Sequence, residues 1–297
     1  MYSRSALTVC MCCVALLADA QTDSQVAGRP ESAIMRSAGL WMVGLLAQAD
    51  DESSRGAAAS FGYGIGESTW FSAVMKRSDS PAERADISAD AFVLGVEHRF
   101  AHVGLSFELE DWGDSGALES ADMAASVIFD LARFEIELGY EQRDIDITFG
   151  LAIGDRVFTR KAPFAAEGRS FGLLLRASET VRIFYDYRDY DYSRDLAVLP
   201  RIQALNRLSG SALTLANSLL SQAHTLAVDL DIGTKGLSLS WGEDISAVDG
   251  AELSSIGAAL ILPVARRIDL ELSLGRSDSD ALGSSAYAGL GILIYGG

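Results

Sequence analysis

The alternation of apolar and polar residues with a period of two constrains the fold of this chain more than any other feature. Successive side chains of a β-strand point to opposite faces, so a segment with this pattern is apolar on one face and polar on the other. Residues 134–140 read Phe-Glu-Ile-Glu-Leu-Gly-Tyr, and residues 268–274 read Ile-Asp-Leu-Glu-Leu-Ser-Leu. Residues 103–110 and 226–232 repeat the alternation. The pattern recurs along the chain and predicts an all-β protein.

The same criterion predicts about fourteen strands, with ends placed to within about two to four residues. Tight and longer linkers alternate strictly between them. The strands cover residues 38–48, 56–65, 68–77, 87–99, 102–112, 117–130, 133–146, 157–175, 180–192, 223–233, 236–246, 251–263, 267–277 and 284–295. The tight linkers are 66–67, 100–101, 131–132, 177–178, 234–235 and 264–266, and the longer linkers are 49–55, 78–86, 113–116, 147–156, 193–222, 247–250 and 278–283.

This alternation of linker lengths is typical of a transmembrane β-barrel. Such a barrel has an even number of strands, short turns on the periplasmic side and long loops on the outer side. No backbone group can stay unpaired in hydrocarbon, so the sheet must close on itself. A soluble β-sandwich gives no reason for the alternation. We therefore expect a closed antiparallel up-and-down transmembrane barrel over residues 38–297.

The N-terminal segment has the features of a cleaved secretory signal peptide. Arg4 provides a basic start, residues 6–18 form a short apolar run, and Ala18-Asp19-Ala20 is a small-x-small cleavage site. Residues 1–20 are therefore predicted to be removed, which leaves residues 21–37 as a short periplasmic tail. The apolar run is shorter than the ~20 residues that a membrane-spanning helix requires.

Cysteine content and charge argue against several classes of protein. The cysteines Cys10, Cys12 and Cys13 all lie in the signal peptide, so the mature chain offers no thiol and no cysteine ligand. We expect neither a metal nor another cofactor. The formal net charge is −17 and survives cleavage, because Arg4 and Asp19 leave together. Acidity of this kind argues against nucleic acid as a partner.

The chain resembles the bacterial outer-membrane β-barrel proteins over residues 38–295, through the signal peptide, the cysteine-free mature chain, the dyad repeat and the even strand number. Residues 287–295, Tyr-Ala-Gly-Leu-Gly-Ile-Leu-Ile-Tyr, look like the C-terminal assembly signal of that class, with Gly289 among alternating apolar residues. The class usually ends on an aromatic residue, whereas Gly296 and Gly297 follow here. The resemblance implies a place in the outer membrane, with lipid, lipopolysaccharide and the outer-membrane assembly machinery as partners.

Acidic residues recur on the polar faces of the predicted strands. Contact with lipid would be costly for them, so we expect them in the lumen. Rings of carboxylates select cations, which favours a pore for small cationic or neutral solutes. The alternative is a static ion-pair lattice that fills the interior with Arg133, Arg182, Arg188 and Arg267. The predicted inward acids are Glu108, Glu110, Glu135, Glu137, Asp186, Asp229, Asp231, Asp269 and Glu271.

A run of tyrosines marks the outer end of the ninth predicted strand. Residues 185–192 read Tyr-Asp-Tyr-Arg-Asp-Tyr-Asp-Tyr. Aromatic side chains gather at membrane interfaces, so we interpret Tyr185, Tyr187, Tyr190 and Tyr192 as part of the outer rim. The alternative hypothesis is a sugar or cation contact site that includes Asp186, Asp189 and Asp191.

The longest linker, residues 193–222, changes from period two to a helical spacing. We predict two short amphipathic helices in this outer loop, one begun by Pro200 and one after Ser209-Gly210-Ser211. Burial of their apolar faces favours a loop that folds into the lumen as a constriction, and the alternatives are a rim cap or a partner contact. Such loops resemble, weakly, those of the long-chain fatty-acid channels, whose longer plug and Asn-Pro-Ala motif are absent. The apolar residues are Leu199, Ile202, Leu205, Leu208, Leu215, Leu219 and Leu220.

Catalysis would need a base or a nucleophile in a recognisable arrangement. The histidines are His98, His102 and His224. None precedes the Ser-Asn-Gly of the outer-membrane phospholipases, and the His-Asp couple and the separate Asp pair of the omptin proteases have no counterpart, because Asp229 lies five residues beyond His224. We therefore expect a channel rather than an enzyme. The other hypotheses are a structural or interaction barrel with a closed lumen that acts through its outer loops, a transporter of hydrophobic substrates, and a barrel hydrolase.

Overall fold

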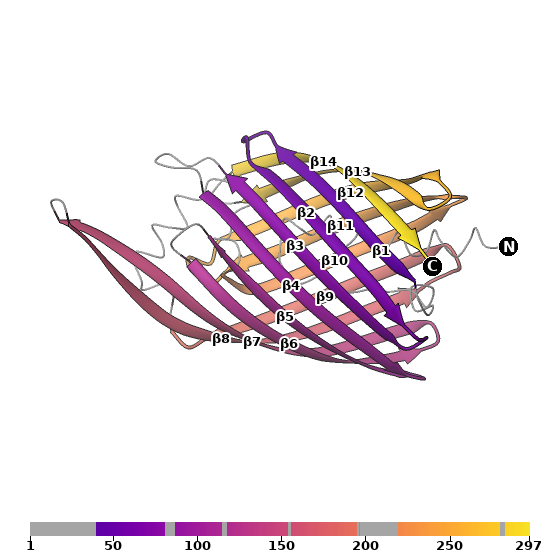
Figure 1. Ribbon diagram of the computed structural model, residues 1–297, viewed down its shortest axis with the longest axis horizontal. Helices are drawn as coiled ribbons and strands as arrows, with labels where there is room; N and C mark the ends of the chain where they lie inside the picture. Colours follow the sequence, from indigo (N-terminus) through magenta and orange to yellow (C-terminus); the bar gives the residue numbers. More distant parts are fainter. Residues whose placement is uncertain are drawn as a thin grey trace.

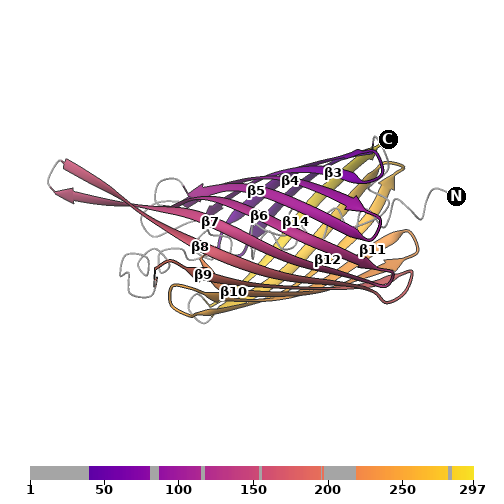
Figure 2. The same cartoon turned by 90° about the horizontal axis from the view of Figure 1, so that it is seen from below.

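The computed structural model describes residues 40–80, 87–114, 118–153, 156–194, 196, 219–279 and 283–297. Within these ranges, fourteen antiparallel strands form one closed barrel (Figures 1 and 2). The strands are β1 (Trp41–Asp50), β2 (Arg55–Ile65), β3 (Thr69–Ser80), β4 (Ile87–Phe100), β5 (Val103–Asp114), β6 (Leu118–Leu131), β7 (Phe134–Ile153), β8 (Arg156–Arg176), β9 (Val181–Tyr192), β10 (Leu220–Ile232), β11 (Lys235–Ser246), β12 (Glu252–Ala265), β13 (Ile268–Ser279) and β14 (Gly283–Gly296).

Every strand pairs with its neighbours in the sequence, and the first strand closes the barrel against the last. The β1–β14 ladder runs from the Trp41↔Gly296 pair to the Asp50↔Tyr287 pair. The predicted closed antiparallel barrel of fourteen strands is confirmed. Among the described residues, no helix combines the length and apolar character needed to cross a membrane.

The two ends of the barrel differ in their connections. Tight turns gather at the end where the chain terminates at Gly297, which we call the turn end, and the opposite end is the loop end (Figure 2). Two-residue turns follow the Phe100↔Val103 and Leu131↔Phe134 pairs. Ala101 and Ala132 adopt positive φ there, at 47° and 59°, as tight hairpin turns require.

The linker predicted over residues 147–156 is wrong, because the two strands beside it continue. β7 and β8 are 20 and 21 residues long and stay paired out to Ile153↔Arg156. The hairpin projects past the rest of the loop end (Figure 1). The sequence Thr148-Phe149 before the tip and Val157-Phe158-Thr159 after it is rich in β-branched and aromatic residues, which favour strand over loop.

The closing seam is also tied together at the loop end. The backbone N–H of Ala286 and the hydroxyl of Ser285 both donate to Asp51 Oδ1, at 2.9 and 3.0 Å. These bonds, the Ala286 N–H first, hold the pKa of the Asp51 carboxyl below its usual range. A carboxyl with a lowered folded-state pKa stabilises the fold above its ordinary titration range, and this stabilisation disappears as the pH falls through the folded-state pKa.

The outer surface of the barrel is apolar. Outward-facing positions hold large side chains that stay open, such as Leu94, Leu272 and Leu274 at 44%, 42% and 64% exposure. Monomeric soluble proteins rarely expose so continuous an apolar surface. The polar residues of the same strands lie on the inner wall, so the sheet is inverted relative to a soluble barrel with an apolar core.

Candidate lumenal site

The structure places all nine predicted lumenal acids at inward positions of their strands. Five of them are at least 93% buried from solvent, namely Glu110, Glu135, Asp229, Asp269 and Glu271. The other four are partly exposed, namely Glu108, Glu137, Asp186 and Asp231.

Arg143 forms the centre of an ion-pair cluster on the inner wall. Its side chain is completely buried, and its Nε donates to Glu141 Oε1 at 2.6 Å and lies 3.4 Å from Asp122 Oδ2. The guanidinium also lies 4.0 Å from the ring centre of Tyr190 and donates to the Tyr190 hydroxyl at 2.8 Å. Trp112 Nε1 donates to Asp122 at 2.8 Å. The β5, β6, β7 and β9 walls are thereby joined by one buried charge network.

A second cluster surrounds Arg99, nearer the turn end. Its Nη1 and Nη2 donate to the two carboxylate oxygens of Glu135 at 2.8 and 2.9 Å, and its Nε donates to Glu97. Arg176 adds a further bond to Glu135 at 3.1 Å and one to Asp130 at 3.2 Å. This bidentate geometry is the strong form of the arginine–carboxylate pair.

The cations of this lattice are only partly the predicted ones. Arg188 lies 2.9 Å from Asp186, and Arg182 lies 3.9 Å from Asp229. Arg133 and Arg267 are instead exposed in tight turns, so their proposed place in the interior was wrong. Sequence reasoning missed Arg99, Arg143 and Arg176. Arg99 and Arg143 each lie two residues after an inward acid, Glu97 and Glu141. The period-two pattern could therefore have placed both arginines on the inner wall.

The four tyrosines of β9 do not share one face. Tyr185 and Tyr187 face outward beside His224, whose Nδ1 lies 3.0 Å from the Tyr185 hydroxyl. Tyr190 and Tyr192 face inward, because two residues, Arg188 and Asp189, separate Tyr187 from Tyr190 and reverse the parity. The outer-rim interpretation therefore does not suit the inward pair, and Tyr190 belongs to the Arg143 cluster instead.

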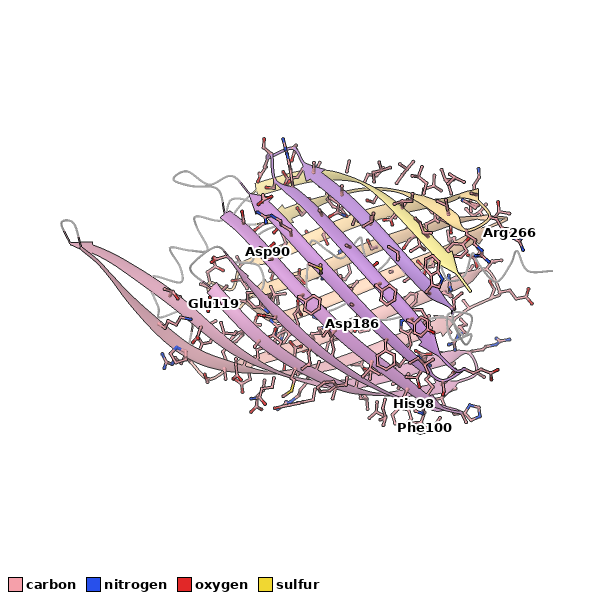
Figure 3. The ribbon with its side chains drawn as sticks, viewed as in Figure 1. Asp90, His98, Phe100, Glu119, Asp186 and Arg266 are labelled. Atoms are coloured by element: carbon pink, nitrogen blue, oxygen red, sulfur yellow. The ribbon has the colours of Figure 1, made fainter. Side chains whose placement is uncertain are left out.

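The remaining histidines lie near the turn end. Thr69 Oγ1 lies 2.8 Å from Nδ1 of His98, which packs against Phe100 on the outside of the barrel (Figure 3). His102 is exposed in a tight turn. Among the described residues, no three His, Cys, Asp or Glu side chains are grouped so that they could hold a metal ion.

A band of small residues lies side by side on the inner wall. Ser72 pairs with Gly95, and Ser126 pairs with both Ser106 and Gly139, which in turn pairs with Ser170. A Cβ at Gly139 would lie 2.2 Å from Ser170 Oγ, so a larger residue there would require the Ser170 hydroxyl to turn away. The band borders a cavity of about 80 Å³ inside the barrel, which reaches from Trp70 to Arg188.

The cavity is strongly acidic. Among the described residues that line it, Arg188 is the single cation. Several of the acids have partners already described, since Glu97 pairs with Arg99, and Asp122 and Glu141 pair with Arg143. The acids that line it are Glu97, Glu108, Glu110, Asp122, Glu137, Glu141 and Asp186.

Apolar clusters lie on the inner wall on both sides of this acidic zone. The turn-end cluster contains Met42, Trp70, Ala259, Ile261 and Leu293. The loop-end cluster contains Trp112, Leu118, Ile145, Ile147, Phe164, Leu196, Leu219 and Val248. Leu196 and Leu219 are 2% and 3% exposed in this cluster. Leu219 and Leu220 were predicted to lie in the second helix of the loop, but this is wrong for Leu220, because β10 begins there. The proposed constriction residues Leu199, Ile202, Leu205, Leu208 and Leu215 lie outside the described residues.

Comparisons with known proteins agree on the fold. No family model and no curated protein matches the sequence. Among solved structures, a monoaromatic hydrocarbon channel, CymD, is similar with a TM-score of 0.56 and 7% identity, over 94% of this chain and 92% of that one. The outer-membrane protein OmpT of Vibrio cholerae is similar with a TM-score of 0.50 and 7% identity, over 86% and 97% of the two chains. The chain therefore shares the fold of bacterial outer-membrane β-barrels.

Proposed function

We propose that this protein is an outer-membrane channel that passes small solutes and prefers cationic or neutral ones. The observation that carries the proposal is the closed barrel with an apolar outer surface and an inner wall on which acids outnumber cations. The apolar surface suits hydrocarbon, and an acid-lined passage raises the local concentration of cations. Nothing in this arrangement requires catalysis, so we propose a role without enzymatic activity.

The proposed orientation places the turn end in the periplasm and the loop end outside the cell, with lipid and lipopolysaccharide around the barrel. The assembly machinery would recognise β14, and the signal peptide would direct export. Short periplasmic turns and long outer loops are the general arrangement of such barrels. The long β7–β8 hairpin then projects outward from the cell.

We expect an epitope tag at the tip of that hairpin, between Ile153 and Arg156, to bind antibody on intact cells. The same tag at Gly66-Glu67, in a tight turn, should bind only after the outer membrane is made permeable. Flow cytometry of intact and permeable cells measures both. Equal labelling of the two tags on intact cells would rule out this orientation.

Conductance in planar bilayers, with ion selectivity measured in a salt gradient, tests the channel directly. The double variant Glu108→Gln with Glu137→Gln should lower the cation-to-anion permeability ratio by roughly a factor of two, because it removes two lumenal charges from the acidic side. The matched control is Asp111→Asn with Asp144→Asn. It removes the same charge from the same two strands, but from outward positions, and should leave the ratio unaltered.

A structural or interaction barrel with a closed lumen is the second candidate. The turn-end cluster favours it, because Trp70 and its apolar neighbours occupy the inner wall where a passage would open into the periplasm. The absence of any conductance, in protein that assembles with the orientation given above, would establish this second role. A hydrophobic-substrate transporter is favoured only by the apolar lining at the loop end.

A further inference from the structure

We propose that the acidic cavity binds a linear organic diamine, with Glu110 as the carboxylate that holds one of its ammonium groups. This inference rests on the proposed channel, since it names a solute for the same lumen. It starts from a lumenal acid that the protein itself leaves without a close partner. By contrast, Glu97, Asp122, Glu141 and Asp186 near it each form an ion pair with an arginine.

Glu110 is 95% buried, and its Oε1 accepts no hydrogen bond from the described residues. Lys76 and Arg143 act on Glu110 electrostatically, but from beyond ion-pair distance. The adjacent inward acid on β5, Glu108, is likewise outside ion-pair distance of any described cation. Burial of an acid without a counter-charge is costly, so a cation that enters the cavity gains an interaction that the fold does not supply.

The shape of the cavity selects the class of cation. Residues of β6 from Asp122 to Ile128 line it, and the six residue-to-residue steps between these two extend over roughly 20 Å. Its small volume over that length makes it narrow, which suits an unbranched alkyl chain. Acids recur along it, from Glu110 near one end to Glu97 at the other. Ser106 and Ser126 supply hydroxyls between them.

An ammonium ion fits this site better than a metal ion does. Carboxylates must converge within about 2.5 Å of one point to hold a calcium or magnesium ion. The part of the chain that the structure describes has no such grouping. An alkylammonium needs only one carboxylate at hydrogen-bond distance, and its alkyl chain can lie against the cavity wall. The second ammonium group of a diamine is then attracted by the acids further along the cavity.

The probe is butane-1,4-diamine, added to one side of a bilayer that contains single channels, with butylamine as the singly charged comparison. We expect the diamine to interrupt the current at a concentration about tenfold lower than butylamine does. Glu110→Gln should weaken the diamine block about tenfold, because an interaction with a buried charge is lost. The matched control is Asp111→Asn on the opposite face of the same strand, which should leave the block unaltered.

A second variant, Ala124→Leu, tests the cavity without a change in charge. Ala124 lines the cavity between Asp122 and Ser126, so a larger side chain there should also weaken the diamine block. Heat-modified mobility on a gel shows whether each variant has assembled. Equal block by the two amines, or a block that Glu110→Gln does not alter, would overturn the diamine site and leave the channel intact.

If the protein passes no current at all, the channel proposal fails and the site is tested by itself. Calorimetric titration of butane-1,4-diamine into the protein in detergent should then give heat in the wild type and in Asp111→Asn, but not in Glu110→Gln. No heat in the wild type would overturn the site.

Discussion

Arg143→Ala should destabilise the folded barrel by about 3 to 5 kcal/mol, the usual result when one member of a buried ion pair is removed. The change leaves Asp122 and Glu141 without the guanidinium that serves both. It also removes the hydrogen bond to the Tyr190 hydroxyl and the positive charge over the Tyr190 ring. Urea-induced unfolding in lipid vesicles, followed by tryptophan fluorescence, measures the loss.

The control for this prediction is Arg276→Ala. Arg276 forms an ion pair of 2.8 Å with Asp278, but both side chains are more than half exposed on the outside of the barrel. Water screens such a pair and it contributes little, so the control should unfold like the wild type. Similar urea midpoints for the two variants would show that the Arg143 cluster does not stabilise the barrel.

Leu272→Arg should destabilise the barrel in a bilayer by about 2 to 4 kcal/mol, because arginine on the lipid face is costly near the middle of the membrane. Leu272 lies in the middle part of β13 and is 42% exposed on the outward face. The comparison is Leu272→Ala, which keeps the surface apolar and should cost much less. Unfolding in vesicles separates the two, and an equal cost for both would mean that this face does not contact hydrocarbon.

The fold could be predicted almost completely from the sequence, because both of its determinants are local. Period two fixes which residues face outward, and the linker lengths fix the strand order. The error at residues 147–156 has a local cause, because Gly150, Gly154 and Asp155 are residue types typical of turns and loops. The β7–β8 ladder continues there through backbone hydrogen bonds, and the pattern of side chains in the sequence does not reveal such bonds.

The candidate site could be predicted only in part. The period-two alternation was sufficient to place Glu135 and Asp229 on the inner wall. It could not show that Glu135 is held by Arg99, or that Glu110 lacks such a partner, because the register between strands decides which side chains meet. The band around Gly139 and Ser126 is likewise invisible in the sequence, where glycine and serine have many other uses. Only the pairing between neighbouring strands brings these small residues side by side on the inner wall.

The pairing of β1 with β14 has a consequence for how the protein must fold. The contacts of this seam join the two ends of the chain, for example Asp51 with Ala286, which are 235 residues apart. Closing so long a loop costs conformational entropy before any ladder bond is gained, and folds dominated by such distant contacts form slowly. Until β14 is in place, β1 and β13 each keep an open edge, which is a template for association with other chains. The newly made chain therefore needs protection from aggregation along its whole length until its last strand has arrived.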